Sequence, residues 1–179
     1  MSAGAHLATA LAAEREGHER LLQGEDSTDA YRRARDAYLS SHAEMGARSW
    51  GRLIGALKMA VLAADGVEAV ARQAVDETTG VDPGPAAAYA RALGQVALGA
   101  APDVREMLTA GDAFERTGRA LAALGAGDGE AFEAAVGEIR ADFAERQEHL
   151  AGVAIADTAV VLERLAAGRG LTGGWRVRR

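Results

Sequence analysis

The spacing of the apolar residues limits the fold of this chain more than any other feature of its sequence. Apolar residues recur with the period of an α-helix along nearly the whole chain. No stretch alternates between apolar and polar residues for long enough to form a strand. Alanine is very frequent; it has the highest helix propensity, and its small side chain lets helices approach closely. The pattern therefore predicts an all-α fold.

Breaks in this pattern divide the chain into about nine antiparallel helices with short links, among them a short one over 103–110 and a long one over 130–150. The third, from about Ser49 to Ala64, has only Arg52 and Lys58 as charges, and we expect it at the centre of the fold. The Gly- and Pro-containing stretch "TTGVDPGP" is the clearest break. We expect a compact helical domain over residues 1–170, with an internal break near 79–85. The basic stretch 171–179 should form a loosely ordered tail.

The composition argues against several classes of function. The chain has no cysteine, which excludes disulfides, thiolate metal sites and a cysteine nucleophile and fits a reducing cytoplasm. A net charge of −6 disfavours a nucleic-acid partner. Neither a signal-peptide pattern nor an apolar run long enough to cross a membrane is present. We therefore expect a cytoplasmic protein without nucleic-acid or membrane partners, and the excess of alanine, arginine and glycine indicates a high-GC bacterial genome.

Two segments carry a resemblance to a known repeat family. In "DAYRRARDAY" and "DGEAFEAAVGEI", an aromatic residue is followed three positions later by a small one, namely Tyr31 with Ala34 and Phe132 with Ala135. These segments resemble the second helices of tetratricopeptide-type repeats, although the Trp and Gly-Tyr positions of the first helices and the closing prolines are missing. The resemblance implies helical hairpins closed by a last helix. The C-terminal block, from "ALAALG" to "VVLERLA", resembles helical bacterial toxin-immunity proteins and other uncharacterised bacterial helical proteins.

Two Glu-His pairs with a spacing of four raise the question of a metal site. They are Glu14 with His18, and Glu145 with His149. Di-iron bundles use Glu-x-x-His and zincins use His-Glu-x-x-His, and neither motif occurs in the chain. We interpret both pairs as ion pairs one helical turn apart, and we assign no metal and no cofactor.

Lys58 and Asp157 are single charges within otherwise apolar stretches. A buried charge without a partner is costly, so we expect the two to pair, together with Thr158 and His42. Such a network would fix the last helix against the third, which is the interpretation we favour, or it would form part of a ligand pocket. The residues of that candidate pocket are Trp50, Lys58, His149 and Asp157.

Tyr31 and Tyr38 lie seven residues apart and so share one helical face, with Arg35 and His42 nearby. Aromatic and arginine side chains carry much of the binding energy at protein interfaces, so these four residues are candidates for binding a partner in a groove between helices. In the alternative, both tyrosines pack in the core with their hydroxyls at its edge.

No catalytic motif is present. The chain has neither a Gly-x-Ser-x-Gly elbow nor a phosphate-binding loop. We therefore expect a non-enzymatic interaction module that binds a protein or peptide as an adaptor or as an immunity-like inhibitor. The alternative is a small-ligand binder or enzyme that uses the pocket around Lys58. The oligomeric state stays open, with a homodimer among the alternatives.

Overall fold

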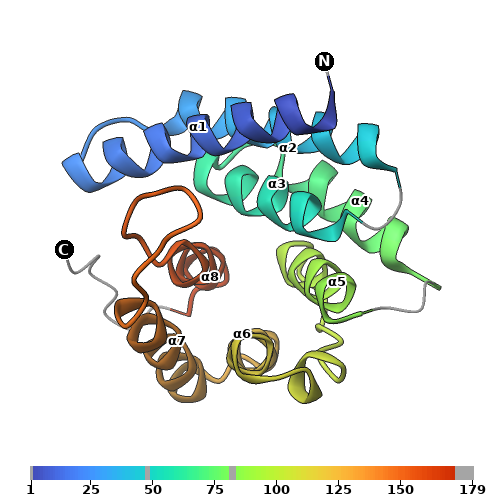
Figure 1. The fold of residues 1–179 in the computed structure, drawn as a ribbon. Helices are drawn as coiled ribbons and strands as arrows, with labels where there is room; N and C mark the ends of the chain where they lie inside the picture. The colour runs from blue at the N-terminus through green and yellow to red at the C-terminus, as the bar shows by residue number, and fades with distance from the viewer. Residues whose placement is uncertain (1, 47–48, 81–83, 172–179) are drawn as a thin grey trace.

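A computed structural model describes residues 2–46, 49–80 and 84–171, and Figure 1 shows its fold. Within these residues the chain forms eight α-helices, one 3₁₀ turn and no strand, which confirms the predicted all-α array. The elements are α1 (Ala3–Gln23), α2 (Thr28–Met45), α3 (Trp50–Ala63), α4 (Val67–Thr78), α5 (Pro85–Ala97), η1 (Met107–Thr109), α6 (Asp112–Ala126), α7 (Gly129–Ala144) and α8 (Asp157–Gly168).

The first two helices form a long hairpin. The Ser2 hydroxyl accepts a hydrogen bond from the Ala5 N–H and caps α1, and Gly24 ends the helix with φ of 74°. Gly17 lets the two helices approach closely, because a Cβ there would lie 2.5 Å from the ring of Tyr31. The close approach brings the Tyr31 hydroxyl to His18 on α1.

Helix α3 lies at the centre, as its apolar sequence predicts. It contacts α2, α4, α5 and α8, and its inward side chains, such as Leu53, Leu57 and Met59, have no exposed surface. One continuous core includes residues from both halves of the chain. Residues 81–83 of the predicted break near 79–85, and residues 172–179 of the predicted basic tail, lie outside the described residues.

Two predicted helices are shorter in the structure. The segment 103–110 contains only the 3₁₀ turn, and α7 ends at Ala144 rather than continuing to Leu150. Segment 145–156 then leads back to α8, which contacts α3, α6 and α7 (Figure 1). Helix α8 begins at Asp157, so this residue and Thr158 lie where the segment meets the centre of the molecule. Across the described residues, no helix is long and apolar enough to cross a membrane.

Candidate functional site

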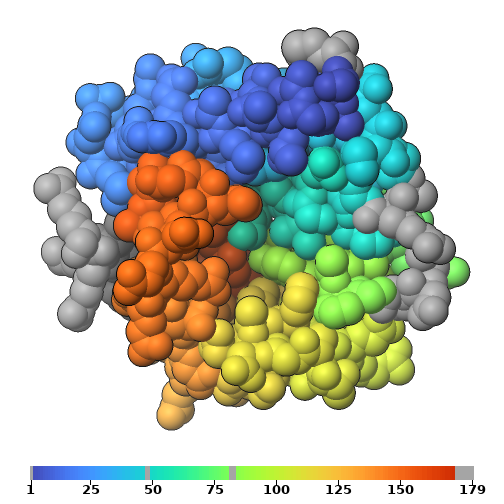
Figure 2. Space-filling view, in the orientation of Figure 1, coloured from blue at the N-terminus to red at the C-terminus, as the bar shows by residue number. Residues whose placement is uncertain are grey.

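A cavity of about 280 Å³ lies among α1, α3, α5, α6, α7, segment 145–156 and α8. A groove of about 540 Å³ lies beside it and shares Glu14, Lys58, Leu150 and Asp157 with the cavity lining. In Figure 2 the surface is hollowed between segment 145–156 and α3. The polar side chains at the floor of the cavity are those of Glu14, His18, Lys58, Tyr89, Asp157 and Thr158.

Lys58 and Asp157 form the predicted ion pair. The Lys58 Nζ donates to Asp157 Oδ2 at 2.9 Å and to Thr158 Oγ1 at 2.7 Å, and the Thr158 N–H donates to Asp157 Oδ1. Burial alone would lower the pKa of Lys58, but the charge and hydrogen bond of Asp157, together with Tyr89 and Glu14, outweigh it and the pKa is raised. Burial would likewise raise the pKa of Asp157, but Lys58 holds it below its ordinary value. The pair is therefore ionised on both sides.

Glu14 and His18 join this floor from α1. Both are almost fully buried, and Glu14 Oε1 lies 3.3 Å from His18 Nε2. Tyr38 donates a hydrogen bond of 2.5 Å to Glu14 Oε2, and His18 Nδ1 lies 3.0 Å from the Tyr31 hydroxyl. Burial raises the pKa of both tyrosines, so their hydroxyls stay protonated. Buried polar contacts thus join α1 to α2 and α3 to α8.

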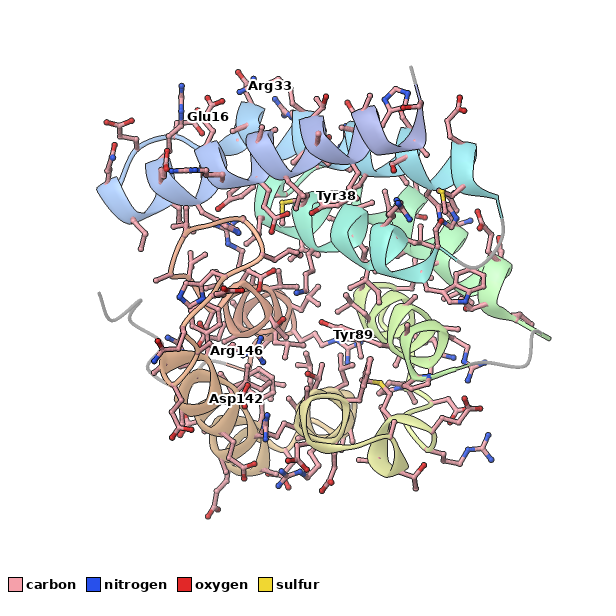
Figure 3. The ribbon with its side chains drawn as sticks, in the orientation of Figure 1. Glu16, Arg33, Tyr38, Tyr89, Asp142 and Arg146 are labelled. Atoms are coloured by element: carbon pink, nitrogen blue, oxygen red, sulfur yellow. The ribbon has the colours of Figure 1, made fainter. Side chains whose placement is uncertain are left out.

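The opposite side of the cavity carries two arginines, Arg116 and Arg146, and two acids, Asp142 and Glu148. Arg116 on α6 and Arg146 after α7 both donate to Asp142, each at 2.5 Å. The arginine Nη atoms share this one carboxylate, and the two guanidiniums hold the pKa of Asp142 below its ordinary value. Figure 3 shows Asp142 and Arg146 together at the end of α7.

His149 lies in the cavity wall but not in a helix. It stacks on Phe143, with a distance of 4.5 Å between ring centroids, and its Nδ1 is buried without a hydrogen-bond partner among the described residues. Because α7 ends at Ala144, Glu145 and His149 are not one helical turn apart, and the predicted ion pair between them is wrong. Segment 145–156 places only the histidine of this pair in the cavity lining.

The other residues of the predicted ligand pocket are partly brought together. Lys58, His149 and Asp157 line the cavity, whereas Trp50 lines the neighbouring groove. His42 does not join the Lys58 pair, which corrects the prediction. Its ring instead lies 2.7 Å from Ser49 Oγ and 2.7 Å from Glu77 Oε2, and so connects α2 to the start of α3 and to α4.

The four predicted partner-binding residues do not form an exposed face. Tyr31, Tyr38 and His42 are buried, and Arg35 donates to Asp65 in the turn after α3. The tyrosines belong to the core, as in the alternative weighed above, with their hydroxyls bonded inside it rather than at its edge. These tyrosines are buried because α1 approaches α2 closely and covers the face of α2 on which they lie.

Four residues of the cavity have no signal in the sequence that singles them out individually. They are Tyr89, Arg116, Asp142 and Arg146. The spacing of four between Asp142 and Arg146 is the one local signal that could have found a pair, because such residues lie on adjacent turns of a helix. The others come from separate helices, and only the tertiary fold brings them together.

A comparison with protein families, with curated proteins and with solved structures finds no match.

Proposed function

We propose that the chain binds a small organic anion in the 280 Å³ cavity. The observation that carries this proposal is the unused hydrogen-bonding capacity of buried groups in the lining. An ammonium group has three N–H donors, and Lys58 uses two of them, on Asp157 and Thr158. His149 Nδ1 has no partner among the described residues. Buried polar atoms are rarely left unsatisfied, so a bound molecule that supplies their partners would be stabilised.

The two arginines of the cavity supply donors for an anionic molecule, in a lining that also holds the acid Glu148. Arg116 and Arg146 share the single carboxylate of Asp142, so one guanidinium charge remains without a close partner in that group. Guanidinium groups bind carboxylates and phosphates well because their planar N–H donors match those groups. The apolar walls, which include Phe114 and Phe143, would contact the rest of the molecule. A cavity of about 280 Å³ fits a ligand of small-metabolite size.

Thermal unfolding in the presence of small anions tests the proposal. The probes are acetate, succinate, citrate, glutamate and inorganic phosphate, each at millimolar concentration. A probe at about 100 times its Kd should raise Tm by about 5 °C or more. The rise should vanish in Arg146→Gln and Lys58→Met.

Arg33→Gln is the matched control, because Arg33 pairs with Glu16 on the outer side of the α1–α2 hairpin (Figure 3). It should leave the rise in Tm unchanged. No rise with any probe, or an equal rise in wild type and in Arg146→Gln, would contradict the proposal.

The interaction module expected from the sequence stays a prediction. Its four candidate residues are buried or held in ion pairs, so none of them supports it. The resemblance to tetratricopeptide-type repeats and to immunity proteins also stays a prediction.

A further inference from the structure

Three potential metal ligands meet at the floor of the cavity. Glu14, His18 and Asp157 each place one ligand atom so that all three lie within 4.8 Å of one another. Two come from one turn of α1 and the third from the start of α8, 139 residues or more along the chain. We propose that this cluster binds a divalent transition metal ion and that zinc suits its donors best.

The separation of the α1 ligands matches a tetrahedral site. Zinc binds histidine nitrogen and carboxylate oxygen at about 2.0 to 2.2 Å, so two ligands of a tetrahedral ion lie about 3.4 Å apart. Glu14 Oε1 and His18 Nε2 are 3.3 Å apart. The Asp157 ligand atom would have to move by roughly 1.5 Å at most to reach the same separation from both α1 ligands. A rotation of its side chain provides a movement of that size.

The surrounding hydrogen bonds are those that orient metal ligands. A metal-binding histidine usually donates its second N–H to a nearby acceptor, which fixes the ring and the tautomer. Here the Tyr31 hydroxyl lies 3.0 Å from His18 Nδ1 and can accept that proton, leaving Nε2 free for the ion. Tyr38 donates to Glu14 Oε2 and so leaves Oε1 facing the histidine. Both carboxylate and imidazole are therefore held with one ligand atom toward the cluster.

The charge of the floor also favours a cation. Glu14 and Asp157 contribute two negative charges, and Lys58 offsets one of them. With a neutral imidazole the cluster keeps one excess negative charge in a largely buried place, which is costly without a partner. A divalent ion would change the net charge of the cluster and Lys58 from one negative to one positive charge. An anionic fourth ligand from the cavity would then neutralise the site, in the arrangement of zinc sites that keep one position open.

Lys58 opposes a cation, because its ammonium lies 2.9 Å from Asp157 Oδ2. The two oxygens of Asp157 are both engaged, one by Lys58 and the other by the Thr158 N–H. The rotation of Asp157 toward the ion would lengthen one of these bonds, and the bond to the ion would replace the interaction that is lost. The proposal needs no organic ligand, and it stands or falls independently of the proposed function.

Cobalt titration of chelator-treated protein tests the site without any activity measurement. Co²⁺ replaces Zn²⁺ in such sites, and its visible absorption is intense only at low coordination number. We expect saturable binding of one Co²⁺ per chain, an intense visible spectrum and displacement by Zn²⁺. Affinity should fall by about 100-fold or more in Glu14→Gln and His18→Gln, and by about 10-fold to 100-fold in Tyr31→Phe, which removes only the acceptor for His18.

Two controls separate this site from surface binding. Glu16→Gln and His6→Gln change an acid and a histidine on α1 that lie outside the cluster, and they should leave the Co²⁺ affinity unchanged. Saturable binding that is equally strong in His18→Gln would overturn the proposal, as would the lack of any saturable binding by the wild type.

A measurement on the wild type alone covers the case in which the buried variants fail to fold. X-ray absorption of the zinc complex should show one imidazole together with oxygen ligands. Two or more imidazole ligands would contradict the proposal, because His18 is the single histidine of the cluster.

Discussion

Lys58 shows at the scale of a residue how a polar group is held in an alanine-rich core. Its ammonium donates to Asp157 and Thr158, and its side chain is 14% exposed. A buried ion pair contributes little relative to an apolar pair of the same size, but removal of one partner leaves an uncompensated charge. The pair therefore specifies how α8 docks on α3 more than it stabilises the fold.

Replacing Lys58 by methionine tests this account of the pair. Lys58→Met should lower the free energy of unfolding by about 3 kcal/mol, because Asp157 keeps its charge without a partner. The double variant Lys58→Met/Asp157→Leu should regain most of that loss. Urea unfolding measures both. A single variant as stable as the wild type would show that water, rather than Lys58, solvates Asp157.

The same pair makes a prediction about acid. The pKa of Asp157 is lower in the folded chain than its ordinary value of 3.8, so its contribution to stability is complete above that value and is lost as pH falls through the folded pKa. The stability difference between wild type and Asp157→Asn should therefore be largest near neutral pH and should shrink below roughly pH 4. Urea unfolding at a series of pH values measures it, and a difference independent of pH would contradict it.

The sequence reveals the Lys58–Asp157–Thr158 contact because single charges in apolar stretches need partners. It does not reveal that Tyr38 donates to Glu14 or that His42 joins Glu77 instead of Lys58. Those partners depend on which faces of α1, α2 and α4 meet, and the sequence pattern leaves several faces equally apolar.

At the scale of an element, small residues decide how closely the helices pack. Gly94 in α5 lies against α4, and a Cβ there would be 2.8 Å from the Ala71 carbonyl oxygen. Gly94→Ala should therefore destabilise the fold by about 1 to 3 kcal/mol, since backbone must move to admit the methyl group.

Gly137→Ala is the matched control, because the same change in α7 meets nothing within 4 Å. It should stabilise the fold by about 0.5 to 1 kcal/mol through helix propensity. Thermal unfolding should show a lower Tm for Gly94→Ala and a higher Tm for Gly137→Ala. Equal changes in Tm would show that packing at Gly94 is unimportant.

The end of α7 shows where sequence patterns fail for elements. The apolar spacing of 130–150 predicts a helix that continues beyond Ala144, and no proline or glycine between Ala144 and Gly152 marks its end. The stacking of His149 on Phe143 and the pairing of Arg146 with Asp142 accompany the turn away from the helix axis. Contacts of this kind override local propensity, which is a weak preference. The position of α3 was predictable because its apolar residues surround the helix.

At the scale of the whole molecule, the charges of the cavity are separated. Glu14 and Asp157 give the floor an excess of negative charge, while Arg116 and Arg146 lie on the opposite side together with Asp142 and Glu148. No local pattern predicts this separation, because the contributing helices meet only in the folded chain. A metal ion at the floor and an organic anion on the arginine side would together neutralise the cavity.

The most direct test of the account is a nuclear magnetic resonance titration of ¹⁵N-labelled wild-type protein with the five small anions. We expect saturable shifts for at least one anion, concentrated at Thr117, His149 and Thr158, which line the cavity, and none around the surface pair of Glu16 and Arg33. Shifts that are absent, fail to saturate or spread evenly over the surface would contradict the claim that this cavity is a binding site.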